Sequence, residues 1–252
     1  MDGAGRTVTD HRQLGQDKQP SRIAGMFDAI APRYDLLNRV LSAGLDVHWR
    51  ARAIRSLALG GGELVLDLCT GTADLAIAAI NAVPPAARVV GVDFSGEMLR
   101  LGAGKLAARR LDTQIHLVQG DAMRIPLRDA SVDAAMVAFG IRNVQEPDVT
   151  FAEMMRVLRP GGRLAILEFG LPRAAIVRPA YLFYFRHILP RIGGLVSGHS
   201  SAYTYLPASV GTFPEPAMLM SRLKDRGFSD VSAVPLTFGV VYLYSARTPL
   251  RS

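Results

Sequence analysis

Apolar residues recur at intervals of three and four through residues 22–59, which is the spacing of one face of a helix. The positions that carry this pattern are Met26, Phe27, Ile30, Leu36, Leu37, Val40, Leu41, Leu45, Trp49, Ala53, Ile54 and Leu57. Pro32 interrupts the pattern, so we expect one helix before it and further helix after it.

From residue 63 onward, short apolar runs alternate with helical segments. The runs predict strands at 63–68, 88–93, 115–120, 132–139 and 163–169. The segments between them predict helices at 74–81, 95–109 and 146–158. This alternation is typical of parallel strands joined by right-handed crossovers, so we expect an α/β fold with a doubly wound, mostly parallel sheet.

After the fifth predicted strand, a longer helical stretch interrupts the alternation. Residues 176–192 and 203–224 have helical spacing, with proline and glycine interruptions. Residues 228–234 and 240–247 return to an extended pattern, and the short link between them predicts an antiparallel hairpin at the sheet edge.

Length and composition suit one folded domain with a short appendage. The chain has 252 residues, of which 49% are apolar and 20% charged, so it can bury a sizeable core. Residues 1–20 are polar and lack an apolar run, which predicts a flexible tail rather than a secretory signal. We expect a single domain over residues 21–252, with a helical cap at 21–60 and a helical insertion at 170–225.

The charge balance favours an anionic partner. Lys and Arg number 29 against 22 Asp and Glu, a net charge of +7, which suits nucleic acid, an anionic membrane face or an acidic small molecule. The single cysteine, Cys69, excludes a disulfide framework and a Cys-rich metal site. No apolar run approaches the roughly 18 residues of a spanning helix. We therefore expect a cytoplasmic protein, soluble or peripheral on the inner membrane face.

A glycine turn follows the first predicted strand and opens a helix. Gly71 permits a tight turn and close backbone approach to a ligand. Cys69 and Ala73 stand beside it where a pyrophosphate-binding loop carries further glycines, which disfavours a dinucleotide-dependent oxidoreductase. Asp93 ends the second strand 22 residues later, where an acid can hydrogen-bond ribose hydroxyls.

A third acid and a later turn complete the pattern. Asp121 follows the third predicted strand, and its carboxylate can accept a hydrogen bond from an exocyclic amine such as that of adenine. A Pro-Gly-Gly turn at 160–162 precedes the fifth strand. Each feature alone also fits an ordinary turn. In this order over residues 63–170, they resemble the class I S-adenosylmethionine-dependent methyltransferases.

That resemblance implies a Rossmann-like methyltransferase fold, S-adenosylmethionine as cofactor and no metal. It implies that the glycine loop faces the methionine part, Asp93 the ribose and Asp121 the adenine amine. Ala73 stands where many relatives carry Gly and is expected to keep helical dihedral angles. The residues that the resemblance assigns to the cofactor are Asp67, Gly71, Thr72, Asp93, Phe94, Met98, Asp121, Ala122 and Ala138.

Segments outside the cofactor core also resemble one family, the C-methyltransferases of the demethylmenaquinone and ubiquinone pathways. The similar segments are residues 27–38 (FDAIAPRYDLLN), 41–44, 48–50, 139–144 (FGIRNV) and 203–214. The resemblance implies methylation of a ring carbon of a polyprenylated hydroquinone. It leaves open the menaquinone or ubiquinone precursor, the prenyl length and the oligomeric state, a homodimer included.

The same resemblance suggests three residues for the chemistry. Arg142 is expected to stabilise the oxyanion of the substrate, Tyr34 to hydrogen-bond its oxygen, and Asp74 to orient Arg142 or a water that acts as base. Each of the three residues could instead have a purely structural role. Arg142 can pair with Glu146 or Asp148, Tyr34 can pack between helices with its hydroxyl at the surface, and Asp74 can favour its helix dipole.

The span 169–214 is free of acidic residues, basic and rich in aromatic residues. It contains no Asp or Glu, four arginines that supply +4 of the net charge, and 8 of the 18 aromatic residues. Such a span suits a membrane interface and a lipid substrate, and Arg178 and Arg186 are the expected headgroup contacts. It equally suits a core helix with solvated arginines.

Two other function classes compete with this interpretation. Base-amine methyltransferases of nucleic acids often carry Asn/Asp-Pro-Pro-aromatic after the fourth strand, where this chain has Phe-Gly-Ile-Arg at 139–142. We therefore expect no nucleic-acid partner. A non-catalytic subunit of a quinone-synthesis assembly would be expected to lose Asp93 and Asp121, and both are present.

Overall fold

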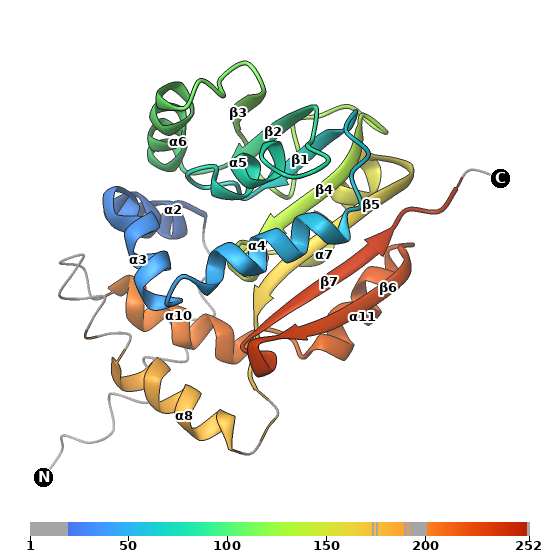
Figure 1. Cartoon of the computed structure of the whole chain (residues 1–252). Coiled ribbons are helices and arrows are strands. Elements are labelled where there is room, and N and C mark those ends of the chain that lie inside the picture. Colours follow the sequence, from blue (N-terminus) through green and yellow to red (C-terminus); the bar gives the residue numbers. More distant parts are fainter. Residues whose placement is uncertain (1–19, 173, 175, 189–190, 192–200, 251–252) are drawn as a thin grey trace, which may run out of the picture.

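The computed structural model describes residues 20–172, 174, 176–188, 191 and 201–250, so nearly all of the expected tail lies outside the described part. Seven strands form one sheet in the order β3-β2-β1-β4-β5-β7-β6 (Figure 1). The strands are β1 (Leu64–Leu68), β2 (Arg88–Asp93), β3 (Ile115–Gln119), β4 (Val132–Ala138), β5 (Leu158–Phe169), β6 (Ser229–Leu236) and β7 (Val241–Arg247).

The pairing of the strands confirms the expected fold class. Strands β1 to β5 pair in parallel, and β7 is antiparallel to both β5 and β6. The last two strands are therefore the predicted hairpin, with the final strand inserted between β5 and the edge strand β6. Parallel neighbours place their carboxyl ends at the same edge of the sheet, and ligands of such sheets bind at this edge.

Two strand boundaries differ from the sequence prediction by more than one residue. Strand β5 begins at Leu158 rather than at residue 163, because Leu158 pairs with Val132 before a register shift in the ladder. The Pro-Gly-Gly turn therefore lies within the strand, with Gly161 at φ 73°. Strand β6 runs on through Leu236, so the hairpin link shortens to the 3-10 turn η4 (Thr237–Gly239).

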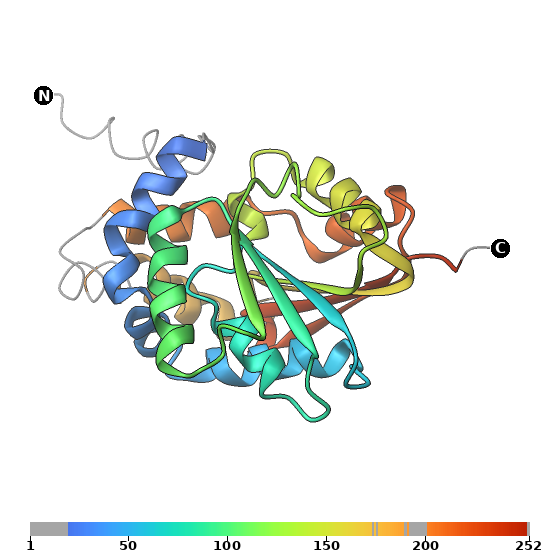
Figure 2. The same cartoon turned by 90° about the horizontal axis from the view of Figure 1, so that it is seen from above.

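Helices cover both faces of the sheet (Figure 2). On one face α4 (Leu45–Ser56) and α5 (Asp74–Ile80) bury side chains against the strands, together with one leucine of α6 (Gly96–Ala108). On the other face α7 (Pro147–Val157) and α11 (Pro216–Asp225) form a second buried cluster. Burial on both faces explains why the strands read as continuous apolar runs.

The remaining helices gather beyond the carboxyl ends of β4 and β5 (Figure 1). From the N-terminal part come α2 (Pro20–Ile30), η1 (Ala31–Arg33) and α3 (Tyr34–Leu41). From the later part come α8 (Val177–Phe183), the π-helical turn η3 (Tyr184–Ile188) and α10 (Ser201–Thr212). Among the described residues, none of the helices has the length and apolarity needed to cross a bilayer.

Candidate active site

A cavity of about 940 Å³, open to solvent, lies at the carboxyl ends of β1, β2 and β4. Seven of the nine residues predicted to bind the cofactor line it: Gly71, Asp93, Phe94, Met98, Asp121, Ala122 and Ala138. The other two, Asp67 and Thr72, lie behind the glycine loop and line a smaller adjoining cavity. The sequence missed Cys69 and Phe139, which also line the main cavity.

The glycine loop has left-handed backbone at three alternating positions. Cys69, Gly71 and Ala73 have φ of 56°, 56° and 68°. The expectation that Ala73 keeps helical angles is therefore wrong, because it lies left-handed just before the first turn of α5. This conformation costs a residue with a Cβ about 1–2 kcal/mol, so the loop holds backbone strain at Cys69 and Ala73.

Asp93 is held in place by backbone donors. Its Oδ2 accepts a hydrogen bond from the Gly71 N–H at 2.9 Å, and its Oδ1 accepts one from Ser95 N–H at 2.9 Å. Burial raises the pKa of Asp93, against the effect of these backbone donors. Ser95 caps α6 through Met98 N–H and donates to Asp28 on α2 at 2.5 Å. The carboxylate thus joins two loops of the cavity.

Asp67 braces the loop from inside the protein rather than lining the main cavity. Its Oδ2 accepts bonds from the Thr70 hydroxyl at 2.6 Å and from Ala76 N–H at 3.1 Å. Burial raises the pKa of Asp67 to about 7, although both hydrogen bonds oppose this shift. The residue is therefore expected to exchange a proton near neutral pH.

The raised pKa predicts a pH-dependent stability. An unfolded Asp titrates near 3.9, so the stabilising contribution of protonated Asp67 declines as pH rises from about 4 to about 7. Asp67→Asn keeps one oxygen as acceptor for both bonds and does not titrate. We expect the free energy of unfolding of the wild type, relative to this variant, to fall by up to about 4 kcal/mol over that range. Urea unfolding at several pH values measures this difference, and a constant difference would contradict the assignment.

A second cavity, of about 1200 Å³, adjoins the first. The two share Phe27, Tyr34 and Phe139. The wall of the second cavity is mostly apolar and aromatic: Met26, Phe27, Ile30, Leu37, Leu41, Leu45, Trp49, Phe139, Phe169, Tyr181, Tyr184, Tyr205 and Val240. The cap helices and the helical insertion supply most of this wall, a role that helical spacing alone did not show.

Arg142 lies on the wall of the second cavity, in the 3-10 turn η2 (Ile141–Asn143). Its side chain is buried, and Nη1 donates to Glu168 Oε1 at 2.7 Å and to the Phe139 carbonyl at 2.6 Å. The guanidinium carbon stands 5.4 Å from the centre of the Phe169 ring. Its partner is thus Glu168, fully buried in β5, rather than Glu146 or Asp148.

Tyr34 begins α3 and lines both large cavities and the small one behind the loop. Its ring meets Phe27 edge-on at a centroid distance of 6.1 Å. Burial raises the pKa of Tyr34, while the hydroxyl's hydrogen bond with Asn38 and the charge of Arg142 act in the opposite direction. The residue therefore stands at the junction where the two cavities meet, not at the outer surface.

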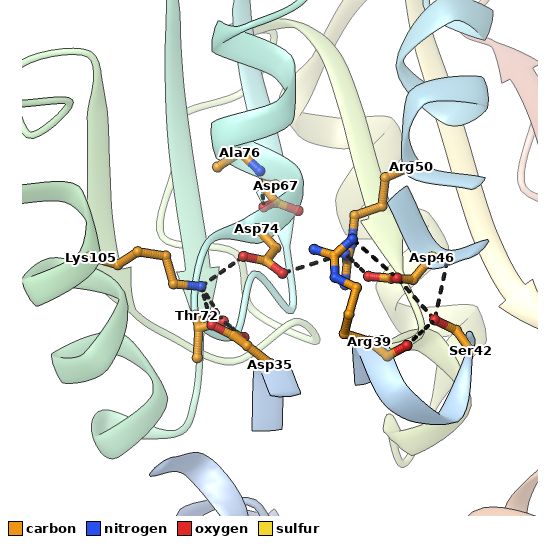
Figure 3. Close-up of polar contacts among 10 residues, drawn as sticks. All are labelled: Asp35, Arg39, Ser42, Asp46, Arg50, Asp67, Thr72, Asp74, Ala76 and Lys105. Carbon is orange, nitrogen blue, oxygen red and sulfur yellow. Dashed lines mark hydrogen bonds and ion pairs between the residues drawn. The ribbon is translucent and has the colours of Figure 1, made fainter. Parts of the chain in front are cut away.

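Asp74 belongs to an ionic network that joins the cap to the glycine loop (Figure 3). It pairs with Lys105 at 2.7 Å and with Arg50 at 3.4 Å. Burial opposes its ionisation, but these two cations hold the pKa of Asp74 below its ordinary value. In the structure Glu168, and not Asp74, pairs with Arg142, and the ion pairs of Asp74 link α5 to α4 and α6.

The network extends to the cap on both sides of Asp74 (Figure 3). Arg50 Nη1 pairs with Asp46 at 2.5 Å. Lys105 pairs with Asp35 on α3, and Thr72 donates to that same carboxylate at 2.5 Å. Thr72 therefore ties the glycine loop to the cap rather than facing the main cavity. The sequence showed no such link, because its members are far apart along the chain.

The chemistry of the residues that line the main cavity suits S-adenosylmethionine. Two carboxylates, of Asp93 and Asp121, stand at the ends of β2 and β3, as hydrogen-bond acceptors for a ribose and an adenine amine require. The apolar side chains of Phe94 and Met98 line the same cavity. The cavity runs past Gly71 to Tyr34, where it meets the second cavity.

This sheet order and this cavity define a class I S-adenosylmethionine-dependent methyltransferase. A solved SAM-dependent methyltransferase from Thermotoga maritima has the same fold, with a TM-score of 0.61 and 16% identity over 88% of this chain and 98% of that one. The sequence model of the ubiE/COQ5 methyltransferase family matches residues 15–247, and the chain belongs to that family. It is a C-methyltransferase that uses S-adenosylmethionine.

Two curated relatives are similar over nearly their whole length. The ubiquinone/menaquinone biosynthesis C-methyltransferase UbiE of Syntrophotalea carbinolica is 48% identical, covering 92% of this chain and 94% of the relative. The demethylmenaquinone methyltransferase of Deinococcus radiodurans is 46% identical, covering 94% of this chain and 95% of the relative. The resemblance inferred from the motifs is confirmed.

Proposed function

We propose that the protein methylates a ring carbon of a polyprenylated hydroquinone in respiratory quinone biosynthesis, either demethylmenaquinol or the equivalent ubiquinone precursor. The observation that carries this proposal is the pair of adjoining cavities. One has acids for a nucleoside, and the other has an aromatic wall with a buried arginine. They share Tyr34 and Phe139, where the methyl donor and the ring would meet. The names of the relatives support the same substrate class.

In this proposal the residues of the first cavity hold S-adenosylmethionine. Asp93 accepts hydrogen bonds from the ribose, Asp121 accepts one from the adenine amine, and Ala122 and Ala138 pack against the adenosyl group. The Gly71 loop faces the methionine part. When bound, the cofactor supplies an electrophilic methyl group on a sulfonium. The positions of Asp67 and Thr72 support an indirect role, since both hold the loop in shape.

The residues of the second cavity act on the substrate ring. A phenol has a pKa near 10 in water, so the ring is a weak nucleophile until its hydroxyl loses a proton. The positive charge of Arg142, fixed by Glu168, stabilises the oxyanion and raises electron density on the ring carbon. Tyr34 donates to the substrate oxygen from the junction, and a water takes the hydroxyl proton. After the ring carbon has accepted the methyl group, that carbon loses its own hydrogen as a proton to water, which restores the aromatic quinolate.

A direct assay tests the function. The purified protein is incubated anaerobically with S-adenosylmethionine and a naphthohydroquinone that carries one prenyl unit. We expect a product heavier by one methyl group on a ring carbon, identified by mass spectrometry. The 1,4-dimethoxy analogue, which cannot form an oxyanion, is the matched control and should not react. Methylation of neither the naphthohydroquinone nor the equivalent benzohydroquinone would refute the proposal.

The prenyl tail requires contact with a membrane, and we propose that α8 provides it. Arg178 is exposed on α8, and Ile176 and Phe183 are 90% and 59% exposed. On its inner side, the same segment contributes Tyr181 and Tyr184 to the second cavity. An exposed apolar and basic surface above the substrate cavity fits a peripheral site on an anionic bilayer. The side chain of Arg186 lies outside the described residues.

Vesicle sedimentation tests this contact. We expect reversible binding to anionic vesicles that weakens as salt rises, because each Arg near such a surface contributes about 1 kcal/mol and is screened by ions. Arg178→Glu/Arg186→Glu should reduce binding and turnover of a long-tailed quinol, yet spare a tail-less analogue. Arg109→Glu/Arg110→Glu makes the same charge change at the end of α6 and should bind nearly as the wild type does. Equal binding to neutral and anionic vesicles would contradict the proposal.

A further inference from the structure

The wall of the second cavity contains buried polar atoms that have no hydrogen-bond partner among the described residues. Arg142 Nε and the Tyr205 hydroxyl are two of them. Both side chains are only 6% exposed. A buried donor without a partner costs free energy, because it has given up its hydrogen bonds to water and gained none in the protein. Two such donors on one cavity wall therefore indicate a site made for an acceptor that a ligand brings.

The fold brings these two groups together from distant parts of the sequence. Helix α10, which carries Tyr205, contacts the turn η2, which carries Arg142, and also α2 of the cap. The charges of Arg142 and Glu168 both act on the Tyr205 hydroxyl. Burial raises the pKa of Tyr205, although Arg142 opposes this, so the hydroxyl keeps its proton and acts as a donor at neutral pH.

We propose that the Tyr205 hydroxyl and the Arg142 Nε–H together donate hydrogen bonds to one ring oxygen of the quinol. This inference rests on the proposed function and adds a substrate-binding residue to it. The rest of the wall is largely apolar, so these two donors favour an oxygen that carries negative charge. Tyr205 thereby stabilises the quinolate, and the hydroxyl proton of the substrate passes to water as before.

Tyr184 provides a matched control on the same cavity wall. Its hydroxyl donates to the Leu41 carbonyl at 2.9 Å, so it already has a protein partner. Replacing each tyrosine by phenylalanine should therefore have opposite effects. Tyr205→Phe removes an unpaired buried hydroxyl and should leave the melting temperature of the free protein unchanged or higher. Tyr184→Phe removes a formed hydrogen bond and should lower it.

The two variants should differ in the opposite sense when activity is measured: Tyr205→Phe, which is not destabilised, should be the less active of the two. With the one-prenyl naphthohydroquinone, Tyr205→Phe should lower kcat/KM about 10- to 100-fold, as expected for a lost bond to a charged group. Tyr184→Phe removes a hydroxyl that already has a protein partner, so its loss in kcat/KM should be much smaller than that of Tyr205→Phe. The acidic limb of the kcat profile should move to higher pH in Tyr205→Phe, because the bound quinol loses a donor that favours its ionised form. A residue that only supports the fold would not move this limb.

Binding is read independently of turnover from Trp49, the only tryptophan in the chain and part of the same cavity wall. Titration of its fluorescence with the naphthohydroquinone should show weaker binding for Tyr205→Phe than for Tyr184→Phe. Affinity for S-adenosylhomocysteine should be the same in both. If the wild type turns over the quinol while Tyr205→Phe matches it in kcat/KM and pH profile, the inference is overturned and the proposed function stands. If the wild type does not react, the proposed function itself fails.

Discussion

Arg142→Ala is expected to lower kcat by two to three orders of magnitude, with little change in cofactor affinity. The guanidinium lies in the wall of the substrate cavity and is held by Glu168 at 2.7 Å. The loss of one preorganised donor to a developing oxyanion has an effect of about this size. Arg142→Lys should recover only part of the rate, because an ammonium cannot both pair with Glu168 and present a second planar donor.

The single alanine variant also leaves Glu168 buried without its cation, which can cost several kcal/mol of stability. The double variant Arg142→Ala/Glu168→Gln removes that charge and should be as inactive as Arg142→Ala while regaining stability. Stopped assays with the naphthohydroquinone give kcat, and calorimetry with S-adenosylhomocysteine confirms that each variant is folded. Full turnover by the double variant would remove Arg142 from the chemistry.

The second large effect is expected at Asp93. We expect Asp93→Ala to weaken S-adenosylmethionine binding by about 1.5–3 kcal/mol or more, since hydrogen bonds to a charged group are lost. The structure gives a second reason for a loss of affinity. The same carboxylate accepts hydrogen bonds from the N–H groups of Gly71 and Ser95, so it also holds the loop in its conformation. Asp93→Asn keeps an acceptor without the charge and should bind with intermediate affinity.

Calorimetric titration with S-adenosylmethionine measures these affinities. Asp28→Ala is the control, because Asp28 accepts a hydrogen bond from the hydroxyl of Ser95, the residue whose backbone N–H donates to Asp93, yet Asp28 does not line the cavity. Its effect on affinity should be much smaller than that of Asp93→Ala. Wild-type affinity in a folded Asp93→Ala protein would show that the ribose lies elsewhere.

Local signals in the sequence were enough for the sheet and for the cofactor cavity. Each parallel strand is a short apolar run, and Gly71, Asp93 and Asp121 directly follow or end three of them. Because parallel strands align their carboxyl ends, residues in these positions necessarily meet. The structure accordingly places all three on one cavity wall.

Contacts between distant segments could not be read in the same way. Glu168 and Arg142 are 26 residues apart, and Lys105 and Asp74 are 31 apart, so neither pair follows from helix or strand periodicity. One feature of the sequence does distinguish Glu168: it is the last acidic residue before a long span without Asp or Glu. The left-handed backbone of Ala73 could not be predicted either, because the geometry of the turn overrides the preference of alanine for right-handed helix.

The two cavities have walls of different origin. The sheet and its connecting loops build most of the first cavity, whereas the cap and the helical insertion build most of the second. Phe27, Tyr34 and Phe139 are the boundary that both sides share. Substrate preference and methyl-donor use are therefore separable in evolution. Changes in the helices over the strand ends can diversify the acceptor, while the strand ends themselves continue to present the same donor.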